Sequence, residues 1–310
     1  MDRGVVVFHT YRTLGAVLSA LPEPVALAAA SLVGTVLAHV RSDQRATIAS
    51  NLRRVLGPGT DPRSLDRWVD RAFRSYARYW MEGARLARTP RSEVMQHFVV
   101  EEGLGHLADG MASGRGVVMA LPHIGSWEYG GAFLAGIGYP MTAVAERVEP
   151  PRLFDYFVRE RAAMGLRVVA LGPESGPAVV RTVRQGGLVG LLCDRDLTGT
   201  GVAVELFGEP TTMPVGPATV ALRTGAVLLT AAVYSGPGRE HHAIINPPVD
   251  TARMGAFRED VQRVTQQIAR ELEGLIRRAP EQWHVFQPLW TVDRVPVAGG
   301  EAVRTPTGGP

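Results

Sequence analysis

The chain has 310 residues, enough for one large domain or two small ones at ~150 residues per domain, and 45% of them are hydrophobic, as in ordinary globular proteins. All 33 basic residues are arginine, which excludes Walker A nucleotide-binding proteins, protein kinases and pyridoxal enzymes, because each of these needs a lysine. The net charge is only +3 and the arginines are spread along the chain, so the sequence lacks the cluster of positive charge that is typical of nucleic-acid-binding proteins. The single cysteine, Cys193, excludes a disulfide scaffold and suggests a reducing compartment.

The N-terminal region joins an uncharged apolar segment to an arginine-rich one. Residues 25–40 carry no charge, but they are fewer than the ~20 that a spanning helix needs, and Pro22 and Pro24 separate them from the apolar stretch before them. We therefore expect a helical hairpin that packs on the domain or lies in the membrane interface, with a spanning helix as the alternative. Residues 41–92 indicate helices rich in arginine and aromatic residues, typical either of a surface on anionic lipid or of a solvated helix face with a packed aromatic stripe.

Short apolar runs alternate with amphipathic stretches in the rest of the chain, which indicates βαβ units. The expected strands are Gly116–Leu121, Met141–Ala145, Arg167–Leu171, Leu188–Cys193 and Val227–Val233. The expected helices are Tyr129–Ile137, Arg152–Gly165, Ala178–Gln185 and Met254–Arg278. The fold class is therefore α/β, with a mostly parallel central sheet flanked by helices. We divide the chain into an N-terminal helical, membrane-associating region (1–92), an α/β catalytic core (93–290) and a disordered tail (291–310).

Polar side chains follow three of the expected strands. The first is followed by His123, the second by Glu146 and Arg147, and the fourth by Asp194, Arg195 and Asp196. Because ligands of an open parallel sheet bind just beyond the carboxyl ends of its strands, these residues define a candidate site.

His123 is the candidate general base, with Glu128 five residues later in the first turn of a helix. A nearby acid would fix the tautomer of the imidazole and stabilise its cation. The other seven histidines are interpreted as ordinary core or surface groups: His9, His39, His97, His106, His241, His242 and His284. No GxSxG or HExxH motif occurs, and Cys193 is interpreted as a packing residue. The sequence thus indicates a base without a protein nucleophile or a metal, so the nucleophile must come from a substrate.

Three blocks of sequence resemble known acyltransferases. His123 and Glu128 resemble the HX4D/E motif of the glycerophospholipid-type acyltransferases. Residues 193–226 resemble a block of the bacterial lipid A late acyltransferases. Together with AERVEP (145–150) and WHVFQPLW (283–290), they resemble the actinobacterial phosphatidylinositol mannoside acyltransferases more closely. The similarity covers roughly residues 10–292.

The resemblance implies transfer of a long acyl chain such as palmitoyl from acyl-CoA, as co-substrate, to a mannose hydroxyl of a phosphatidylinositol mannoside. His123 would be the base and Glu128 the motif acid. Asp194 matches a position where the mannoside branch carries a glutamate paired with the histidine, so either acid could orient His123. Glu146, Arg147, Arg161 and Arg195 match family positions around the headgroup or CoA, or form structural ion pairs.

The resemblance also implies a peripheral protein on the cytoplasmic face of the membrane, with no cofactor. A groove lined by residues such as Trp127, Phe133 and Leu134 would take the acyl chain. The alternatives are a lipid A-like or other phospholipid acyltransferase, with acyl-carrier protein as a possible donor, a lipid-binding protein without catalysis, and a thioester hydrolase.

Overall fold

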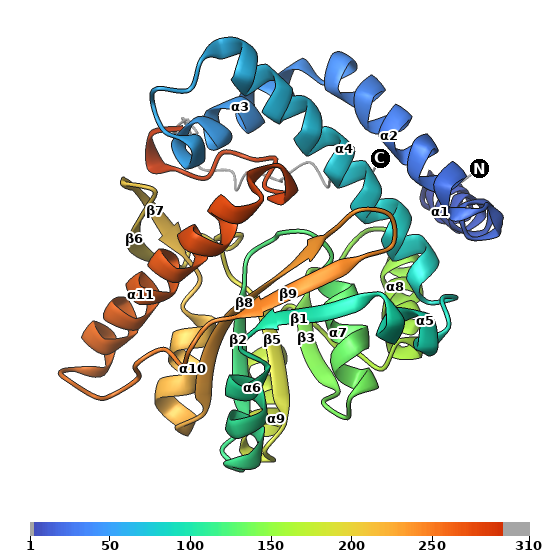
Figure 1. Ribbon diagram of the computed structural model, residues 1–310. Helices are drawn as coiled ribbons and strands as arrows, with labels where there is room; N and C mark the ends of the chain where they lie inside the picture. Colours follow the sequence, from blue (N-terminus) through green and yellow to red (C-terminus); the bar gives the residue numbers. More distant parts are fainter. Residues whose placement is uncertain (1–2, 294–310) are drawn as a thin grey trace.

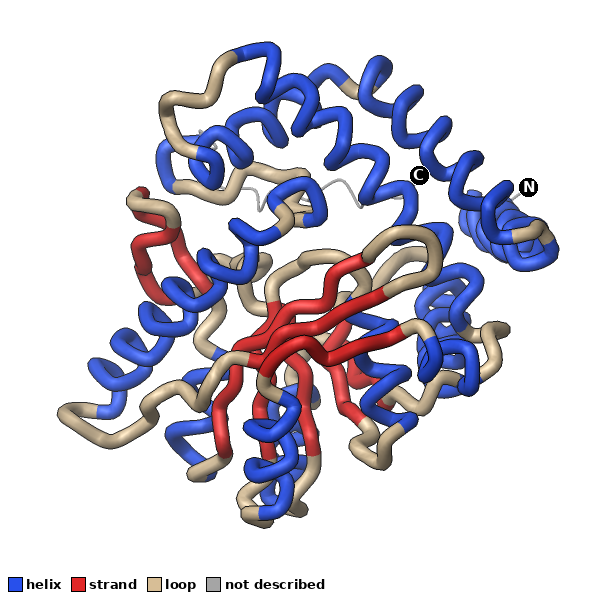
Figure 2. The backbone as a smooth tube through the Cα atoms, viewed as in Figure 1, coloured by secondary structure: helices blue, strands red, loops and turns tan. Residues whose placement is uncertain are grey.

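The computed structural model describes residues 3–293, which form a central sheet enclosed by helices (Figures 1 and 2). The helices are α1 Arg3–Ala20, α2 Glu23–Val40, α3 Ser42–Leu56, α4 Pro62–Leu86, α5 Arg91–Gln96, α6 Leu104–Ala112, α7 Trp127–Gly136, α8 Pro151–Ala163, α9 Ser175–Arg184, α10 Gly216–Thr224 and α11 Phe257–Arg278, with short 3-10 turns at Pro280–Gln282 and Thr291–Asp293. The strands are β1 Phe98–Glu102, β2 Val117–Leu121, β3 Met141–Ala145, β4 Arg167–Ala170, β5 Leu188–Leu192, β6 Val202–Leu206, β7 Glu209–Met213, β8 Val227–Ser235 and β9 His241–Ile245.

Seven of these strands form one sheet in the order β1-β9-β8-β2-β5-β3-β4. The five strands from β8 to β4 are parallel, whereas β9 is antiparallel to β8 and carries β1 beside it. β6 and β7 make a separate hairpin. The expected mostly parallel α/β sheet is confirmed, and all five predicted apolar runs are strands of it.

Alternate residues of the strands enter two different cores, one on each face of the sheet. On β2, Val118 and Ala120 pack with α9, α10 and α11, while Val117 and Met119 pack with α5, α6 and α7. This period of two follows from strand geometry, and burial on both faces explains why β2 is apolar throughout. The result is a three-layer arrangement, with helices on both sides of the sheet (Figure 2).

The N-terminal helices form a fourth group, with α1, α2 and α3 all packed on α4 (Figure 1). α2 contacts α4 through four small residues spaced four apart, so that they share one helix face: Ala26, Ala30, Gly34 and Ala38. A Cβ on Gly34 would lie 2.6 Å from the Cα of Arg74, so only glycine permits this approach. Among residues 3–293, α2 is the one helix that is long and apolar enough to cross a membrane, judged by length and composition.

Two expected boundaries differ in the structure. The last long helix is expected from about Met254 but begins at Phe257, and the backbone N–H groups of Met254 and Gly255 just before it donate to the Asp260 carboxylate. The tail was expected to be disordered from Thr291, yet the chain forms a turn through Asp293, whose carboxylate pairs with Arg54 at 2.7 Å. The rest of that expected tail, residues 294–310, lies outside the described part of the chain.

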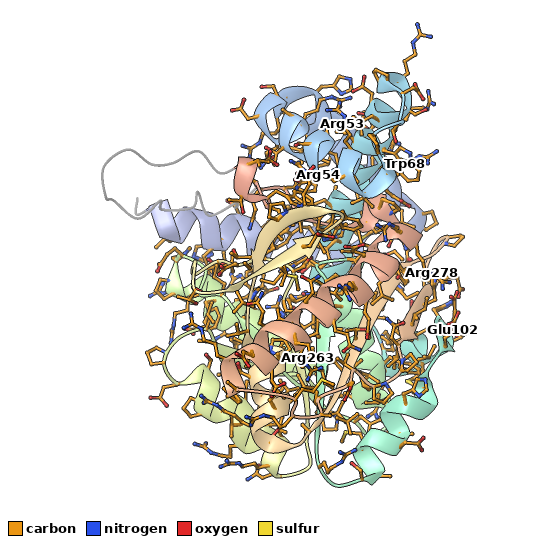
Figure 3. All side chains as sticks on the ribbon, turned by 90° about the vertical axis from the view of Figure 1, so that its left-hand side faces the viewer. Arg53, Arg54, Trp68, Glu102, Arg263 and Arg278 are labelled. Carbon is orange, nitrogen blue, oxygen red and sulfur yellow. The ribbon has the colours of Figure 1, made fainter. Side chains whose placement is uncertain are left out.

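Charged pairs join distant segments across the surface that α11 crosses (Figure 3). Arg278, at the end of α11, pairs with Glu101 at 3.0 Å and with Glu102 at 3.5 Å on β1. Arg54 on α3 also pairs with Glu209 on β7 at 2.8 Å. The Arg54 pairs join the C-terminal segment and the β6–β7 hairpin to α3, whereas the Arg278 pairs join α11 to β1.

Candidate active site

The register of β2 and β5 brings His123 and Asp194 together. These neighbouring parallel strands pair Leu121 with Leu192, and the N–H of Cys193 donates to the Leu121 carbonyl at 3.0 Å. His123 and Asp194 therefore each lie two residues beyond the last paired position, at the same edge of the sheet. His123 Nδ1 lies 2.5 Å from Asp194 Oδ1. The predicted convergence of these two residues is thus a direct consequence of strand pairing.

Asp194 is completely buried and accepts three hydrogen bonds. Besides Nδ1 of His123, its Oδ2 accepts from the backbone N–H of His123 at 2.9 Å and from the indole Nε1 of Trp283 at 2.8 Å. Burial alone would raise the pKa of Asp194, but the charge of His123 and these hydrogen bonds outweigh it and lower the pKa. Asp194 is therefore an ionised carboxylate held in a fixed orientation.

His123 is arranged as a neutral base. An ionised carboxylate can only accept, so Nδ1 carries the proton and Nε2 keeps a lone pair. Burial is the largest influence on the pKa of His123 and lowers it; Asp194 raises it, Arg195 lowers it, and the net direction is downward. The side chain keeps 20% of its surface exposed, which leaves it open to a substrate.

Glu128 belongs to a different ion pair. It lies in the first turn of α7, is 4% exposed, and its Oε1 accepts from Arg161 at 2.9 Å and from the Tyr79 hydroxyl at 3.0 Å. Of the two acids that could orient His123, Asp194 is therefore the one that contacts the imidazole, whereas Glu128 links α7 to α8 and α4. Arg161 also lies over the Trp127 ring, 5.3 Å from its centroid, so this arginine on α8 contacts two residues of α7.

Arg195 faces the dyad from the residue after Asp194. Its Nη1 donates to Gln287 at 3.1 Å, and its buried Nε has no hydrogen-bond partner within the part of the chain that the structure describes. Its charge acts on His123, since it lowers the pKa of that ring. A guanidinium held in this way has a donor free for an anionic group.

Glu146 and Arg147 lie at the same sheet edge, directly after β3, and both are exposed. Arg147 lies over the Phe154 ring at 5.7 Å. Within residues 3–293 neither side chain shares a hydrogen bond or ion pair with His123, Asp194 or Arg195. Asp196 is also separate from the dyad, because its carboxylate accepts the N–H groups of Gly199 and Gly201 in its own loop.

Sequence reasoning missed the C-terminal segment of the site. The chain at Trp283 pairs with Ile124 in a short antiparallel bridge, and the N–H of His284 donates to the His123 carbonyl at 2.7 Å. His284 was interpreted as an ordinary group; its ring is buried against Ser75 at 3.0 Å, and burial lowers its pKa to about 3. The only signal was the block WHVFQPLW, which carried no individual roles.

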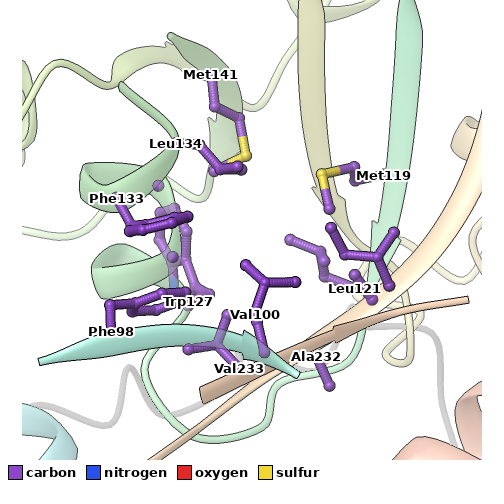
Figure 4. Close-up of a pocket in the computed structure, with 15 residues that line it drawn as sticks. Phe98, Val100, Met119, Leu121, Trp127, Phe133, Leu134, Met141, Ala232 and Val233 are labelled. Carbon is purple, nitrogen blue, oxygen red and sulfur yellow. The ribbon is translucent and has the colours of Figure 1, made fainter. Parts of the chain in front are cut away.

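An apolar cavity of about 30 Å³ lies between α7 and the sheet (Figure 4). It is lined by Phe98, Val100, Met119, Leu121, Trp127, Gly130, Gly131, Phe133, Leu134, Met141, Ala231, Ala232, Val233, Ala243 and Ile245. The three residues expected to line an acyl groove, Trp127, Phe133 and Leu134, are all among them. Two flexible methionine side chains, Met119 and Met141, also border the cavity (Figure 4).

Within residues 3–293, no group of three or more histidine, cysteine, aspartate or glutamate residues is placed to hold a metal ion. The donor set around His123 contains one imidazole and one carboxylate, and both oxygens of that carboxylate are already occupied by hydrogen bonds.

Comparisons with known proteins match nearly the whole described chain. Residues 4–292 match the model of the bacterial lipid A biosynthesis acyltransferase family, and the chain belongs to that family of acyltransferases. A phosphatidylinositol mannoside acyltransferase of Mycobacterium tuberculosis is 38% identical over 252 residues, 79% of this chain and 77% of that protein. A phosphatidylinositol mannoside acyltransferase of Mycolicibacterium smegmatis is 36% identical over 249 residues, 78% of each chain.

Proposed function

We propose that this protein transfers a long fatty acyl chain from acyl-CoA to a mannose hydroxyl of a phosphatidylinositol mannoside. The observation that carries the proposal is the buried His123–Asp194 dyad at the carboxyl edge of the sheet, in a chain of this acyltransferase family. The acceptor is taken from the names of the two mycobacterial relatives.

In the proposed reaction, His123 Nε2 removes the proton from the sugar hydroxyl while that oxygen attacks the thioester carbonyl. Asp194 stabilises the imidazolium that forms. The tetrahedral intermediate collapses to the ester and releases the CoA thiolate, which takes the proton back from His123. No acyl-enzyme is needed, and Cys193 is unsuited to form one, because it is buried and burial raises the pKa of its thiol well above the usual range.

The arginines at the sheet edge fit the charged parts of both substrates. Arg195 offers a buried Nε that has no hydrogen-bond partner among residues 3–293, and its guanidinium is suited to a phosphate or a developing oxyanion. Glu146 and Arg147, exposed at the same edge, are assigned to the sugar and phosphate groups of the substrates. Arg161 acts from further back, since its guanidinium is committed to Glu128.

The cavity behind α7 is the proposed entrance for the acyl chain. Its present volume of about 30 Å³ is too small for a long acyl chain, so the chain requires the cavity to widen. Rotamer changes of Met119 and Met141 would widen the cavity, because methionine side chains change rotamer easily. No cofactor takes part in this scheme, and acyl-CoA is a co-substrate.

The outward face of α2 is the proposed contact with the membrane. Its exposed apolar residues are Val25, Leu32, Val33, Val36 and Val40, and Leu32 is 67% exposed. The opposite face is committed to α4 through Gly34, so we favour a peripheral helix in the interface over one that leaves the protein to span the bilayer. Since acyl-CoA is a cytosolic donor, we assign the protein to the cytoplasmic face of the cell membrane.

The test uses the purified full-length protein with palmitoyl-CoA, with and without phosphatidylinositol mannosides, and follows free CoA together with lipid mass. The proposal expects CoA release that depends on the mannoside and adds one acyl group to it. It also expects loss of transfer in His123→Ala but not in His106→Ala, which changes a histidine on α6 away from the dyad. CoA release without an acceptor would indicate a thioester hydrolase.

A second acceptor class is favoured by the family description itself, which names lipid A biosynthesis. The same dyad chemistry would serve a lipid A-like or other phospholipid acceptor. Parallel reactions with lipid A precursor, lysophospholipid and acyl-carrier-protein donor separate these possibilities. Lipid binding without turnover in every reaction would indicate a lipid-binding protein.

A further inference from the structure

The segment Gln282–His284 crosses the turn that carries His123. The N–H of Gly125 donates to the Gln282 carbonyl at 2.9 Å, and the N–H of His284 donates to the His123 carbonyl at 2.7 Å. Trp283, between them, pairs with Ile124. The main chain of this segment therefore fixes the turn from both sides.

The same segment is anchored firmly to the rest of the protein. The side-chain amide of Gln282 bonds to both backbone groups of Ser235, accepting at 2.8 Å and donating at 2.9 Å. Asn51 on α3 donates to the carbonyls of Val285 at 2.8 Å and Gln287 at 3.2 Å. Trp283 thus projects from a backbone that is held on both sides.

The Trp283 side chain is also fixed in orientation. It is 2% exposed and packs between the rings of Phe207 and Trp290, with centroid separations of 6.0 and 6.2 Å. Its Nε1 donates to Asp194 Oδ2 at 2.8 Å. An indole N–H can only donate, so this contact favours the ionised form of the Asp194 carboxylate.

We propose that Trp283 is a positioning residue of the dyad, whose indole N–H fixes the Asp194 carboxylate and disperses its charge, and so sets the basicity of His123. With Trp283 and the His123 backbone N–H both on Oδ2, only Oδ1 is presented to the imidazole. The consequence for catalysis rests on the proposed function, because it assumes that His123 is the base.

The direction of the effect follows from electrostatics. The titratable and charged groups that act on His123 are Asp194, Arg195, Glu128 and the buried ring of His284. Of these, only Asp194 is hydrogen bonded to Trp283. Without the indole N–H, the carboxylate keeps its place on the His123 backbone N–H, but its negative charge is compensated by one hydrogen bond fewer. It then stabilises the imidazolium more strongly and raises the pKa of His123.

The test is Trp283→Phe, read by NMR titration of the His123 ring in the substrate-free protein, with the signal assigned by His123→Gln. We expect the pKa of His123 to rise by about 0.5–1 unit. The acid limb of the kcat/KM profile should move to higher pH by the same amount, so kcat/KM falls by at most about three- to tenfold on the acid side, and the loss shrinks above pH 8.

The matched control is Trp290→Phe. Trp290 is also fully buried, and its indole donates a comparable hydrogen bond at 3.0 Å, but to the Leu206 carbonyl away from the dyad. It should leave the His123 pKa unchanged. Replacing Trp283 with benzothienylalanine, which removes the N–H and keeps the ring shape, covers the case in which phenylalanine fails to fold.

An unchanged or lowered His123 pKa in the Trp283 variants overturns the proposal, as does an equal shift in Trp290→Phe. Either result would make Trp283 a packing residue. The NMR titration needs no substrate, so the proposed function fails separately, by absence of transfer in the wild-type protein.

Discussion

Replacing Asp194 by asparagine tests the dyad with almost no change in shape. The carboxylate is surrounded by donors: the His123 ring, the His123 backbone and the Trp283 indole. An asparagine must direct its oxygen toward the two donors on Oδ2, which places its NH₂ group against Nδ1 of His123. Nδ1 then has to accept, the ring proton moves to Nε2, and the lone pair needed to deprotonate the sugar is lost.

The expected loss is large because two effects combine. The imidazole is held in the wrong tautomer, and the charge that stabilises the imidazolium is removed. The equivalent change in serine-protease triads lowers kcat by about 10⁴, so we expect kcat/KM of Asp194→Asn to fall by roughly 10³–10⁴. This corresponds to about 4–5.5 kcal/mol of transition-state stabilisation.

The assay measures mannoside-dependent CoA release with a thiol reagent and confirms the product by lipid mass. Asp196→Asn is the matched control, since the same chemical change falls two residues away, where the carboxylate caps its own loop. That variant should keep activity within a few-fold of wild type. A loss below about tenfold in Asp194→Asn, or an equal loss in the control, would refute the assignment of Asp194 as the group that orients His123.

Three further predictions concern stability. Burial lowers the pKa of His284 to about 3 in the folded protein, so the unfolded state binds an extra proton as pH falls below 6.5 and unfolding becomes more favourable. The free energy of unfolding measured in urea should fall by about 2 kcal/mol between pH 7 and pH 5, and this fall should be absent in His284→Gln. Arg161→Met leaves Glu128 without its cation and should lower the free energy of unfolding by about 3 kcal/mol, part of which the double variant Arg161→Met/Glu128→Gln restores; equal melting of the wild type, the single variant and the double variant would contradict a buried pair. Gly34→Ala should cost about 1–3 kcal/mol by calorimetry, because its Cβ meets the α4 backbone, whereas Gly83→Ala, in open space on α4, should be neutral or stabilising.

The sequence predicts the parallel strands well because strands buried on both faces are apolar throughout. The strands it misses lack that pattern. β9 begins with His241 and His242 and depends on pairing with β8. The β6–β7 hairpin turns at Phe207 and Gly208, both with positive φ, where phenylalanine gives no turn signal and is held instead by burial and by a bond from its N–H to Glu273.

The residues of the site likewise fall into those that the sequence predicts and those that it does not. His123 and Asp194 could be predicted because each follows a recognisable strand, and the register of β2 and β5 places them at the same edge of the sheet. The partner of Glu128 could not, since Arg161 reaches it from a different helix, 33 residues further along the chain. Trp283 and His284 belong to an irregular segment whose contact with the His123 turn joins residues 160 positions apart, and no local pattern encodes such a contact.

The bridge between Trp283 and Ile124 has a consequence for how the protein is made. During synthesis the N-terminal helices and β2 emerge first, and His123 is present long before its partners. Asp194 arrives 71 residues later, and Trp283 a further 89 residues after that. A nascent chain can therefore assemble most of its sheet, and bring His123 and Asp194 together, before Trp283 is present. The full set of contacts on the Asp194 carboxylate is a late event in biosynthesis, reached only when the segment around Trp283 docks on the His123 turn.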